Sequence, residues 1–363
     1  EKAMELCAGY GFAVLNHGDR AMTADLGAAE GRALDILAHL DVVPAGDGWD
    51  TDPWTATDKL PTTTGNYYLT RDVSNFGQHN ITTYAVTDVK IDLAGHKITQ
   101  TTAGQMVFSF GKSASATAPA NLTITDSVGG GELVGAAANR LGGLTQGSTL
   151  NIYGGTMNAS ACTIGYGAFL NMNVGYVNMY GGTIKGGSAT ANSGGGSVIL
   201  QNSAVFNFYD GTITGGRLTH PTSGAGGNVT TWNAACVFNQ YGGSVEGGSA
   251  VFGGCNVYVR DGAYNLIGGS IGGGNAKHGG SVYVASKNGG FTMTGGTVTG
   301  GTVTGGEASM GGSIYVGGDS EFKMYDGATV SGGFCDSAKA SSNRGGNIGY
   351  EVGAYEEAKS IAE

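Results

Sequence analysis

The chain has 363 residues and a formal net charge of −10, and 70 of its residues are glycine. Glycine thus makes up about 19% of the chain against a usual level near 7%, but the sequence has only 5 prolines and no strict G-X-Y period, which excludes collagen. Hydrophobic residues, at 40%, are too many for a disordered chain. The acidic charge and the lack of a Lys/Arg-rich run argue against nucleic acid as a partner, and no apolar run is long enough to predict membrane insertion.

Residues 1–57 are predicted to form a small α+β segment. Residues 1–12 place Ala3, Leu6 and Cys7 on one face of a short amphipathic helix, and residues 20–27 and 33–43 have the composition of strands. The stretch AHLDVVPAGDGWDTDPW at 38–54 then brings His39 and Asp41 together in an H-x-D spacing.

This stretch resembles the start of the M20 metallopeptidase family, in particular its dinuclear-zinc dipeptidases. The resemblance implies that His39 stands at a zinc-ligand position and that Asp41 stands at the position that orients its imidazole. A catalytic zinc site needs three protein ligands and an open position. The bridging carboxylate and the Glu-Glu pair of that family are missing from the sequence after Trp54, apart from Glu356-Glu357 in the tail. We therefore expect an incomplete, inactive remnant without a cofactor.

Two interpretations of this opening segment stay open. It is either a recombined or mis-joined peptidase fragment, or a cap that covers the exposed end of the repeats that follow. A cap is expected to pack Leu6, Phe12, Ile36 and Leu37 onto the first coils.

Residues 58–149 are predicted to form irregular first coils of a β-helix, because alternating strands occur at 65–73, 86–99 and 121–127. Residues 150–350 repeat a more regular phrase, seen as LNIYGGTM (150–157), VNMYGGTI (177–184) and FNFYDGTI (206–213). Equivalent Thr or Ser residues at 156, 183, 212, 244, 270 and 297 are 27, 29, 32, 26 and 27 residues apart. A second phrase of the type GGSVYV lies between these copies.

The repeated phrase alternates apolar and polar residues, which is the period of a strand with one buried face. In VNMYGGTI, Val177 and Met179 are predicted to point inward and Asn178 and Tyr180 outward, before a turn at Gly181-Gly182. Stacked coils of this kind bury a continuous core that no single coil could bury. The fold class is therefore predicted to be all-β, a right-handed parallel β-helix (solenoid), with a polar, helical tail at 351–363.

The phrases VKIDLAGHKIT (89–99) and LTITDS (122–127), followed by the repeats, resemble pectin-lyase-like right-handed parallel β-helix proteins of gut and anaerobic bacteria. The resemblance covers about 64–350, and Ala94 stands where that family has Asn. It implies an extracellular or cell wall-attached module, adhesin-like or a stalk, with glycans or host-surface components as partners.

A recurring tyrosine follows the repeated strand and is predicted to form a column along one edge: Tyr153, Tyr180, Tyr209, Tyr241 and Tyr325. Ile267 and Thr294 interrupt this column. Two interpretations remain, a row of platforms that bind sugar rings and a self-stacking ladder that stabilises the corner.

A carbohydrate-active enzyme, either a polysaccharide lyase or a glycosidase, is the alternative function. Such an enzyme needs a carboxylate pair across a groove or acids clustered with Lys or Arg. Asp210 and Asp326 recur at the tyrosine corner, where Asp replaces Gly in a turn, and no residue is assigned a catalytic role. We therefore expect a non-catalytic module.

Overall fold

The computed structural model describes residues 64–74, 80–81, 88–111, 120–145, 147–192, 194–222, 224–285, 289–304, 311–336 and 345–350, and the backbone of strands at 13–16, 22–25 and 55–57. The chain divides into two compact units, Glu1–Pro53 and Trp54–Glu363. In the first unit, β1 (Ala13–Asn16) pairs antiparallel with β2 (Met22–Asp25), which lies within the predicted strand at 20–27. The predicted helix at 1–12 and strand at 33–43, the proposed cap contacts and the tail at 351–363 lie outside the described residues.

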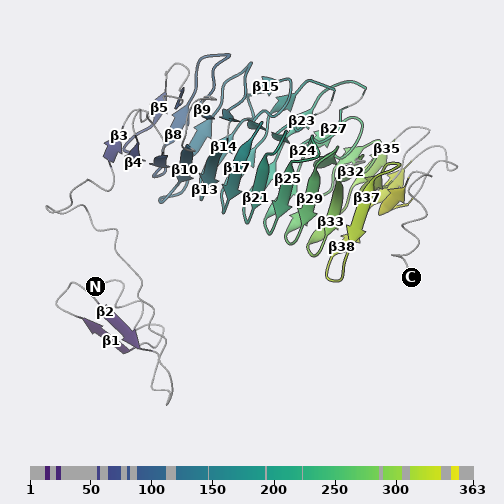
Figure 1. Ribbon diagram of the computed structural model, residues 1–363. Helices are drawn as coiled ribbons and strands as arrows, with labels where there is room; N and C mark the ends of the chain where they lie inside the picture. The colour runs from purple at the N-terminus through teal and green to yellow at the C-terminus, as the bar shows by residue number, and fades with distance from the viewer. Residues whose placement is uncertain are drawn as a thin grey trace. The chain divides into compact units, whose positions relative to one another are not determined.

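The second unit is a parallel β-solenoid, in which successive coils place their strands side by side in long sheets (Figure 1). All of its described strand pairs are parallel, and the described residues contain no helix. The all-β parallel solenoid predicted from the repeats is confirmed.

Three long sheets run along the solenoid. Sheet I has 11 strands: β3 (Thr55–Thr57), β4 (Gly65–Leu69), β7 (Asp88–Asp92), β10 (Asn121–Thr125), β13 (Ser148–Ile152), β17 (Gly175–Met179), β21 (Val205–Phe208), β25 (Val237–Gln240), β29 (Ala263–Leu266), β33 (Gly290–Met293) and β37 (Glu321–Met324). Sheet II has 10 strands: β5 (Val73–Ser74), β8 (Lys97–Thr99), β11 (Glu132–Val134), β14 (Thr156–Asn158), β18 (Thr183–Lys185), β22 (Thr212–Thr214), β26 (Ser244–Glu246), β30 (Ser270–Ile271), β34 (Thr297–Thr299) and β38 (Thr329–Ser331). Sheet III has 10 strands: β6 (Asn80–Ile81), β9 (Phe108–Gly111), β12 (Gly142–Thr145), β16 (Leu170–Met172), β20 (Val198–Leu200), β24 (Val229–Thr231), β28 (Val257–Val259), β32 (Val282–Val284), β36 (Ile314–Val316) and β40 (Ile348–Tyr350).

Two short sheets lie on the path from sheet II to sheet III. Sheet IV has four strands: β15 (Thr163–Ile164), β19 (Ser188–Ala189), β23 (Arg217–Leu218) and β27 (Ser249–Ala250). Sheet V has three strands: β31 (Asn275–Ala276), β35 (Thr302–Thr304) and β39 (Phe334–Asp336). Ala189, Leu218 and Ala250 of sheet IV form a small second core of their own.

The main core lies between the three long sheets and follows the predicted alternation. Val177 and Met179 are fully buried, Asn178 is half-buried and Tyr180 is exposed, as the repeated phrase predicted. Inward aromatic rings of neighbouring coils stack on one another, with centroids 4.8 Å apart for Phe206 and Phe238. Since the strands pair in register, like residues meet like residues from coil to coil.

The second repeated phrase builds a buried polar row just before sheet III. Asn228 Oδ1 accepts hydrogen bonds from Ser197 Oγ (3.1 Å) and from the Gly216 backbone N–H (2.8 Å). Asn228 Nδ2 in turn donates to Asn256 Oδ1 (2.9 Å). A Cβ added to Gly216 would collide with the carbonyl oxygen of Gly227 and lie 2.7 Å from Asn228 Oδ1, which explains the glycine at this position.

From the β13 coil to the β33 coil the corner between sheet I and sheet II keeps a constant length, whereas the arc from sheet II to sheet III does not. Seven residues separate inward positions across the corner, as from Leu150 to Met157 and from the equivalent position in β17, β21, β25, β29 and β33. Across the arc the separation varies, for example 11 residues from Ile271 to Val282 and 16 from Ile213 to Val229. In these coils, variation in coil length is therefore taken up outside this corner, mainly in the arc, and side chains at the corner stay aligned.

Candidate functional site

The aligned corner carries three rows of side chains, which together we name the Asn–Tyr–Thr strip. The strip consists of an asparagine row (Asn151, Asn178, Asn207, Asn239 and Asn265), a tyrosine row (Tyr153, Tyr180, Tyr209 and Tyr241) and a hydroxyl row (Thr156, Thr183, Thr212, Ser244 and Ser270). The first row lies on the outer face of sheet I, the second follows those strands, and the third opens the strands of sheet II. Strand residues two apart point to the same face, so the asparagines and tyrosines lie next to each other.

The tyrosine row is a continuous face-to-face stack. Ring centroids are 4.6 Å apart for Tyr153 and Tyr180, 4.8 Å for Tyr180 and Tyr209, and 4.9 Å for Tyr209 and Tyr241, with interplanar angles of 13°, 1° and 9°. The predicted column is thus brought together for four of its five members. Tyr325 lies apart, because the aligned positions between it and Tyr241 are held by Ile267 and Thr294.

The stacked rings remain accessible at their edges and hydroxyls. The four side chains are 39–54% exposed, although the inner rings turn their faces toward each other. Burial raises the pKa of Tyr180, and the neighbouring phenols Tyr153 and Tyr209 raise it further. A ligand on this row would therefore meet phenol hydroxyls and ring edges rather than open ring faces.

The asparagine row is a ladder of side-chain hydrogen bonds from coil to coil. Each Nδ2 donates to the Oδ1 of the preceding coil, at 3.0 Å for Asn178 to Asn151, 2.9 Å for Asn207 to Asn178, 3.0 Å for Asn239 to Asn207 and 2.9 Å for Asn265 to Asn239. The outward position of Asn178 was predicted from the sequence, but the ladder was not. The signal was the recurrence of Asn two residues before the corner Tyr in every phrase from 150 to 241.

The strip is electrically neutral along sheet I. Outward side chains of β13, β17, β21, β25 and β29 carry no charge, and neutral donors and acceptors predominate. The hydroxyl row adds contacts of the same type, such as the 3.3 Å hydrogen bond from Ser244 Oγ to Thr212 Oγ1. The strip therefore suits a neutral, hydrogen-bonding ligand better than a charged one.

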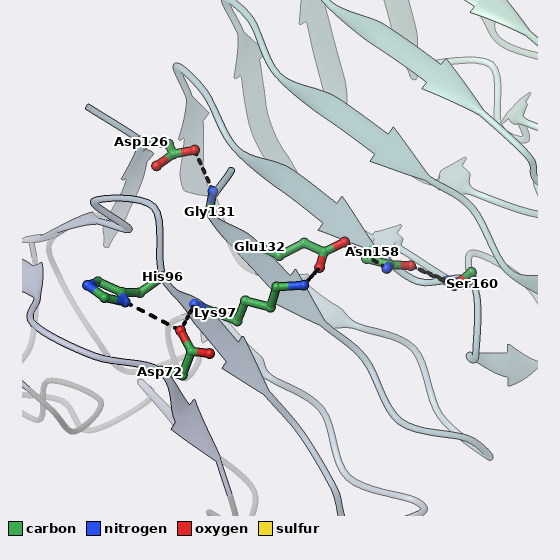
Figure 2. Close-up of polar contacts among 8 residues, drawn as sticks. All are labelled: Asp72, His96, Lys97, Asp126, Gly131, Glu132, Asn158 and Ser160. Carbon is green, nitrogen blue, oxygen red and sulfur yellow. Dashed lines mark hydrogen bonds and ion pairs between the residues drawn. The ribbon is translucent and has the colours of Figure 1, made fainter. Parts of the chain in front are cut away.

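Charged side chains gather on sheet II in the earlier coils, as Figure 2 shows. Lys97 Nζ lies 2.9 Å from Glu132 Oε2, and Asn158 Nδ2 donates to Glu132 Oε1 at 2.9 Å. One coil earlier, Asp72 Oδ1 accepts the backbone N–H of Lys97 (3.0 Å) and lies 3.4 Å from His96 Nδ1. These contacts connect neighbouring coils across the outer face of the sheet.

The pKa values in this cluster follow from those contacts. Burial raises the pKa of Glu132, but the hydrogen bonds from Lys97 and Asn158 outweigh it, so the net shift is downward. The pKa of Asp72 is lowered chiefly by the backbone N–H of Lys97, and that of Lys97 is raised by Glu132. A carboxylate held in this way is a structural partner and not a free general acid.

Two aspartates beside this cluster cap the turns of the first coils. Asp126 accepts backbone N–H groups from Gly95 (2.8 Å) and Gly131 (2.8 Å), the latter drawn in Figure 2. Asp92 accepts the backbone N–H of Ala94 at 3.0 Å. Ala94 has a φ of 48°, in the left-handed region that Asn and Gly adopt more readily.

A second tyrosine row lies on sheet III and was not predicted from the sequence. Tyr258 and Tyr283 stack at 5.1 Å, as do Tyr283 and Tyr315. This row is more covered than the strip, since Tyr315 is only 4% exposed and Phe252 packs at 5.9 Å from Tyr283. Its Tyr sits in GGSVYV-type phrases, where the sequence alone does not show that Phe252 and His278 will pack against the tyrosine face.

The remaining predicted site residues are His39 and Asp41, and both lie outside the described residues. Within the described ranges, no group of three or more His, Cys, Asp or Glu side chains is placed to hold a metal ion. Likewise, no helix in the part of the chain that the structure describes has the length and apolar character needed to cross a membrane.

Comparisons of this chain with family models, with curated proteins and with solved structures found no match. The two family resemblances seen in the sequence therefore remain predictions.

Proposed function

We propose that this chain is a stiff, non-catalytic β-solenoid module of the cell surface or extracellular space, adhesin-like or a stalk. The observation that supports this proposal is the set of side-chain ladders that connect neighbouring coils from β13 to β29. The extracellular setting rests on the resemblance of the repeated phrases to surface β-helix proteins.

Stiffness follows from how many independent links join neighbouring coils. Each coil pairs with the next through the backbones of three long sheets. The asparagine ladder and the tyrosine stack add side-chain links at the corner between sheets I and II, and the buried row through Asn228 adds links beside sheet III. Because each coil in a solenoid contacts only its neighbours, links of this type set the resistance of the rod to bending and peeling.

Changing the number of coils tests this proposal. Deletion of residues 181–209 joins Tyr180 directly to Asp210 and removes one coil in register; four extra copies of the same segment lengthen the chain by four coils. Each coil should change the length of the rod by about 4.8 Å in electron micrographs, with the circular dichroism spectrum per residue unchanged. A spacer keeps its folding and its surface attachment in the shortened variant. Loss of surface attachment on removal of this one coil, with folding intact, would contradict the spacer role.

Glycan binding is the second candidate function, and the neutral, exposed Asn–Tyr–Thr strip favours it. Amide, phenol and hydroxyl groups in repeating rows offer the donors and acceptors that sugar hydroxyls need. The four exposed phenols span three coil steps, so a ligand lying along the row would contact several coils at once.

A glycan array with matched variants tests this second function. Tyr180→Ala and Asn207→Ala, both within the strip, should reduce binding at least tenfold, whereas Tyr325→Ala, more exposed than Tyr180 but outside the row, should leave it unchanged. Equal glycan binding by all three variants would show that the strip is not the binding site. Shortening of a bound glycan would instead favour the carbohydrate-active enzyme.

A further inference from the structure

The protein holds two tyrosine stacks that differ in their exposure to solvent. The corner row (Tyr153, Tyr180, Tyr209 and Tyr241) is 39–54% exposed, whereas in the sheet III row Tyr315 is 4% exposed. Both rows hold phenols of neighbouring coils at 4.6–5.1 Å between ring centroids. The two rows thus have similar spacing but different access for a reagent in solution.

We propose that the exposed tyrosine row is an oxidative cross-linking site, at which hydrogen peroxide and a haem peroxidase join tyrosines of neighbouring coils as dityrosine. The reaction makes a carbon–carbon bond between two rings, each at a carbon next to the one that bears the hydroxyl. The proposal rests on the geometry of the row, and on the proposed extracellular function only for where the protein meets peroxide.

The atoms and electrons of this step balance. Each of two phenols loses one electron and its hydroxyl proton and becomes a phenoxyl radical, and one hydrogen peroxide takes the two electrons and two protons to give two waters. The two radicals pair their electrons in a bond between ring carbons next to the oxygen-bearing carbons. The hydrogen on each of these carbons then moves to the oxygen, which restores both phenols. The protein loses two hydrogen atoms for each cross-link.

The row brings the reacting rings together before oxidation. A radical on Tyr180 has a second phenol 4.6 Å away on one side and another 4.8 Å away on the other. Because both neighbours are held by the same fold, coupling is intramolecular and proceeds at a high effective concentration. Rings must turn out of their parallel stack to bond, and exposure at the corner leaves their outer edges free of covering side chains on the solvent side.

The structure also predicts which tyrosines stay unlinked. Tyr325 is 54% exposed, but Thr294 holds the aligned position in the preceding coil, so it lacks a phenol there. Tyr264 stacks on Phe238 and is fully buried, and its hydroxyl donates to Gln240. A tyrosine that is exposed but has no stacked phenol, or one that is stacked but buried, is therefore not expected to form dityrosine.

Trypsin separates the members of the row in a useful way. Cleavage after Arg140, Lys185, Arg217 and Arg260 gives peptides 141–185, 186–217 and 218–260. Tyr209 is the single tyrosine of peptide 186–217, so a dityrosine that joins this peptide to either neighbour must use Tyr209. Links in the covered row would instead join 278–287, which contains Tyr283, to 218–260 through Tyr258 or to 288–323 through Tyr315.

The test treats the full-length protein with hydrogen peroxide and a haem peroxidase at low protein concentration. Dityrosine fluorescence, intact mass and tryptic peptide maps are then measured for the parent chain and for three variants. Tyr180→Phe keeps one adjacent pair, Tyr180→Phe with Tyr209→Phe keeps none, and Tyr258→Phe with Tyr283→Phe is the matched control in the covered row. Phenylalanine preserves the ring stack, and circular dichroism checks that each variant is folded.

The parent chain and the control pair should lose two hydrogens per link and give peptides joined through Tyr209, with a yield that does not depend on protein concentration. The Tyr180→Phe variant should keep only the link between 186–217 and 218–260. The double corner variant should lose intramolecular dityrosine at least tenfold, although Tyr153, Tyr241 and Tyr325 remain. Undiminished intramolecular dityrosine in that variant, links confined to the covered row, or links only between separate molecules would each overturn the proposal. None of these results depends on the coil-deletion test of the spacer role.

Discussion

Replacing Tyr264 with phenylalanine removes one hydroxyl from the middle of the core. That hydroxyl donates a 2.7 Å hydrogen bond to Gln240 Oε1, and both side chains are fully buried. Gln240 Nε2 keeps its bonds to the backbone oxygens of Ser270 (3.1 Å) and Gly243 (3.3 Å), so the amide cannot turn away without losing them. The variant therefore leaves a buried acceptor without its donor, and we expect the free energy of unfolding to fall by about 1–3 kcal/mol.

A second substitution separates this cause from simple loss of packing. Gln240→Met combined with Tyr264→Phe removes both polar groups, and methionine already fills the equivalent inward positions at Met179 and Met293. Replacing both partners with apolar groups of similar shape is close to neutral. The double variant also removes the Gln240 Nε2 bonds, but the Gly243 carbonyl keeps the backbone N–H of Ser270 as a donor, so we expect it to recover part of the loss.

Urea unfolding followed by circular dichroism measures both variants. Midpoints are compared only where the slope is unchanged, because long repeat arrays can lose two-state behaviour. The exposed Tyr325→Phe is the control and should change stability by less than about 0.5 kcal/mol. A Tyr264→Phe variant with the same free energy of unfolding as the parent chain would refute the reasoning. So would a double variant with a free energy of unfolding as low as that of Tyr264→Phe alone.

Three further predictions concern single positions. Ala94→Gly should raise the free energy of unfolding by about 0.5–1 kcal/mol in urea melts, because φ is 48° at this residue; an unchanged or lower midpoint would contradict the backbone argument. Gly216→Ala should lower it by about 1–3 kcal/mol, since a Cβ there meets backbone and Asn228, whereas Gly165→Ala, with no atom within 4 Å, is the neutral control; equal effects would argue against a steric cause. Glu132→Gln should destabilise the protein at pH 7 but not at pH values well below 4.5, the ordinary carboxyl pKa: its folded-state pKa is lowered, so its contribution is present above the unfolded value and is lost as the pH falls through the folded one. Thermal melts from pH 7 to pH 3 measure this difference, and a gap that does not close in acid would count against the ion pair.

The period of the sequence predicted which residues face the core, and it did so for a physical reason. Alternation at Val177, Asn178 and Met179 fixes the face of a strand without knowledge of its neighbours. The corner glycines fixed where strands end. From these two signals the parallel solenoid and four members of the tyrosine row could be predicted.

Features that depend on contacts between coils were harder to predict. The hydrogen bond between Gln240 and Tyr264 joins residues 24 positions apart, and a buried glutamine in an apolar phrase gave no indication of its partner. The covered row on sheet III depends on arcs of variable length, whose path a period cannot define. The role of Glu132 likewise depends on Lys97 from the preceding coil. His39 and Asp41 lie outside the described residues, so their predicted ancestry stays a prediction.

The asparagine ladder gives the solenoid a direction. From Asn178 to Asn265 each amide donates to the coil before it, whereas the buried row donates from Ser197 to Asn228 and from Asn228 to the following coil. Aligned amide dipoles polarise one another, and here the two sets lie antiparallel, one facing solvent and the other within the protein. The hydrogen-bond donors of the strip therefore all point toward the N-terminal coils, so the two directions along its surface are not equivalent. An elongated ligand whose own two ends differ would bind along it in one orientation in preference to the other.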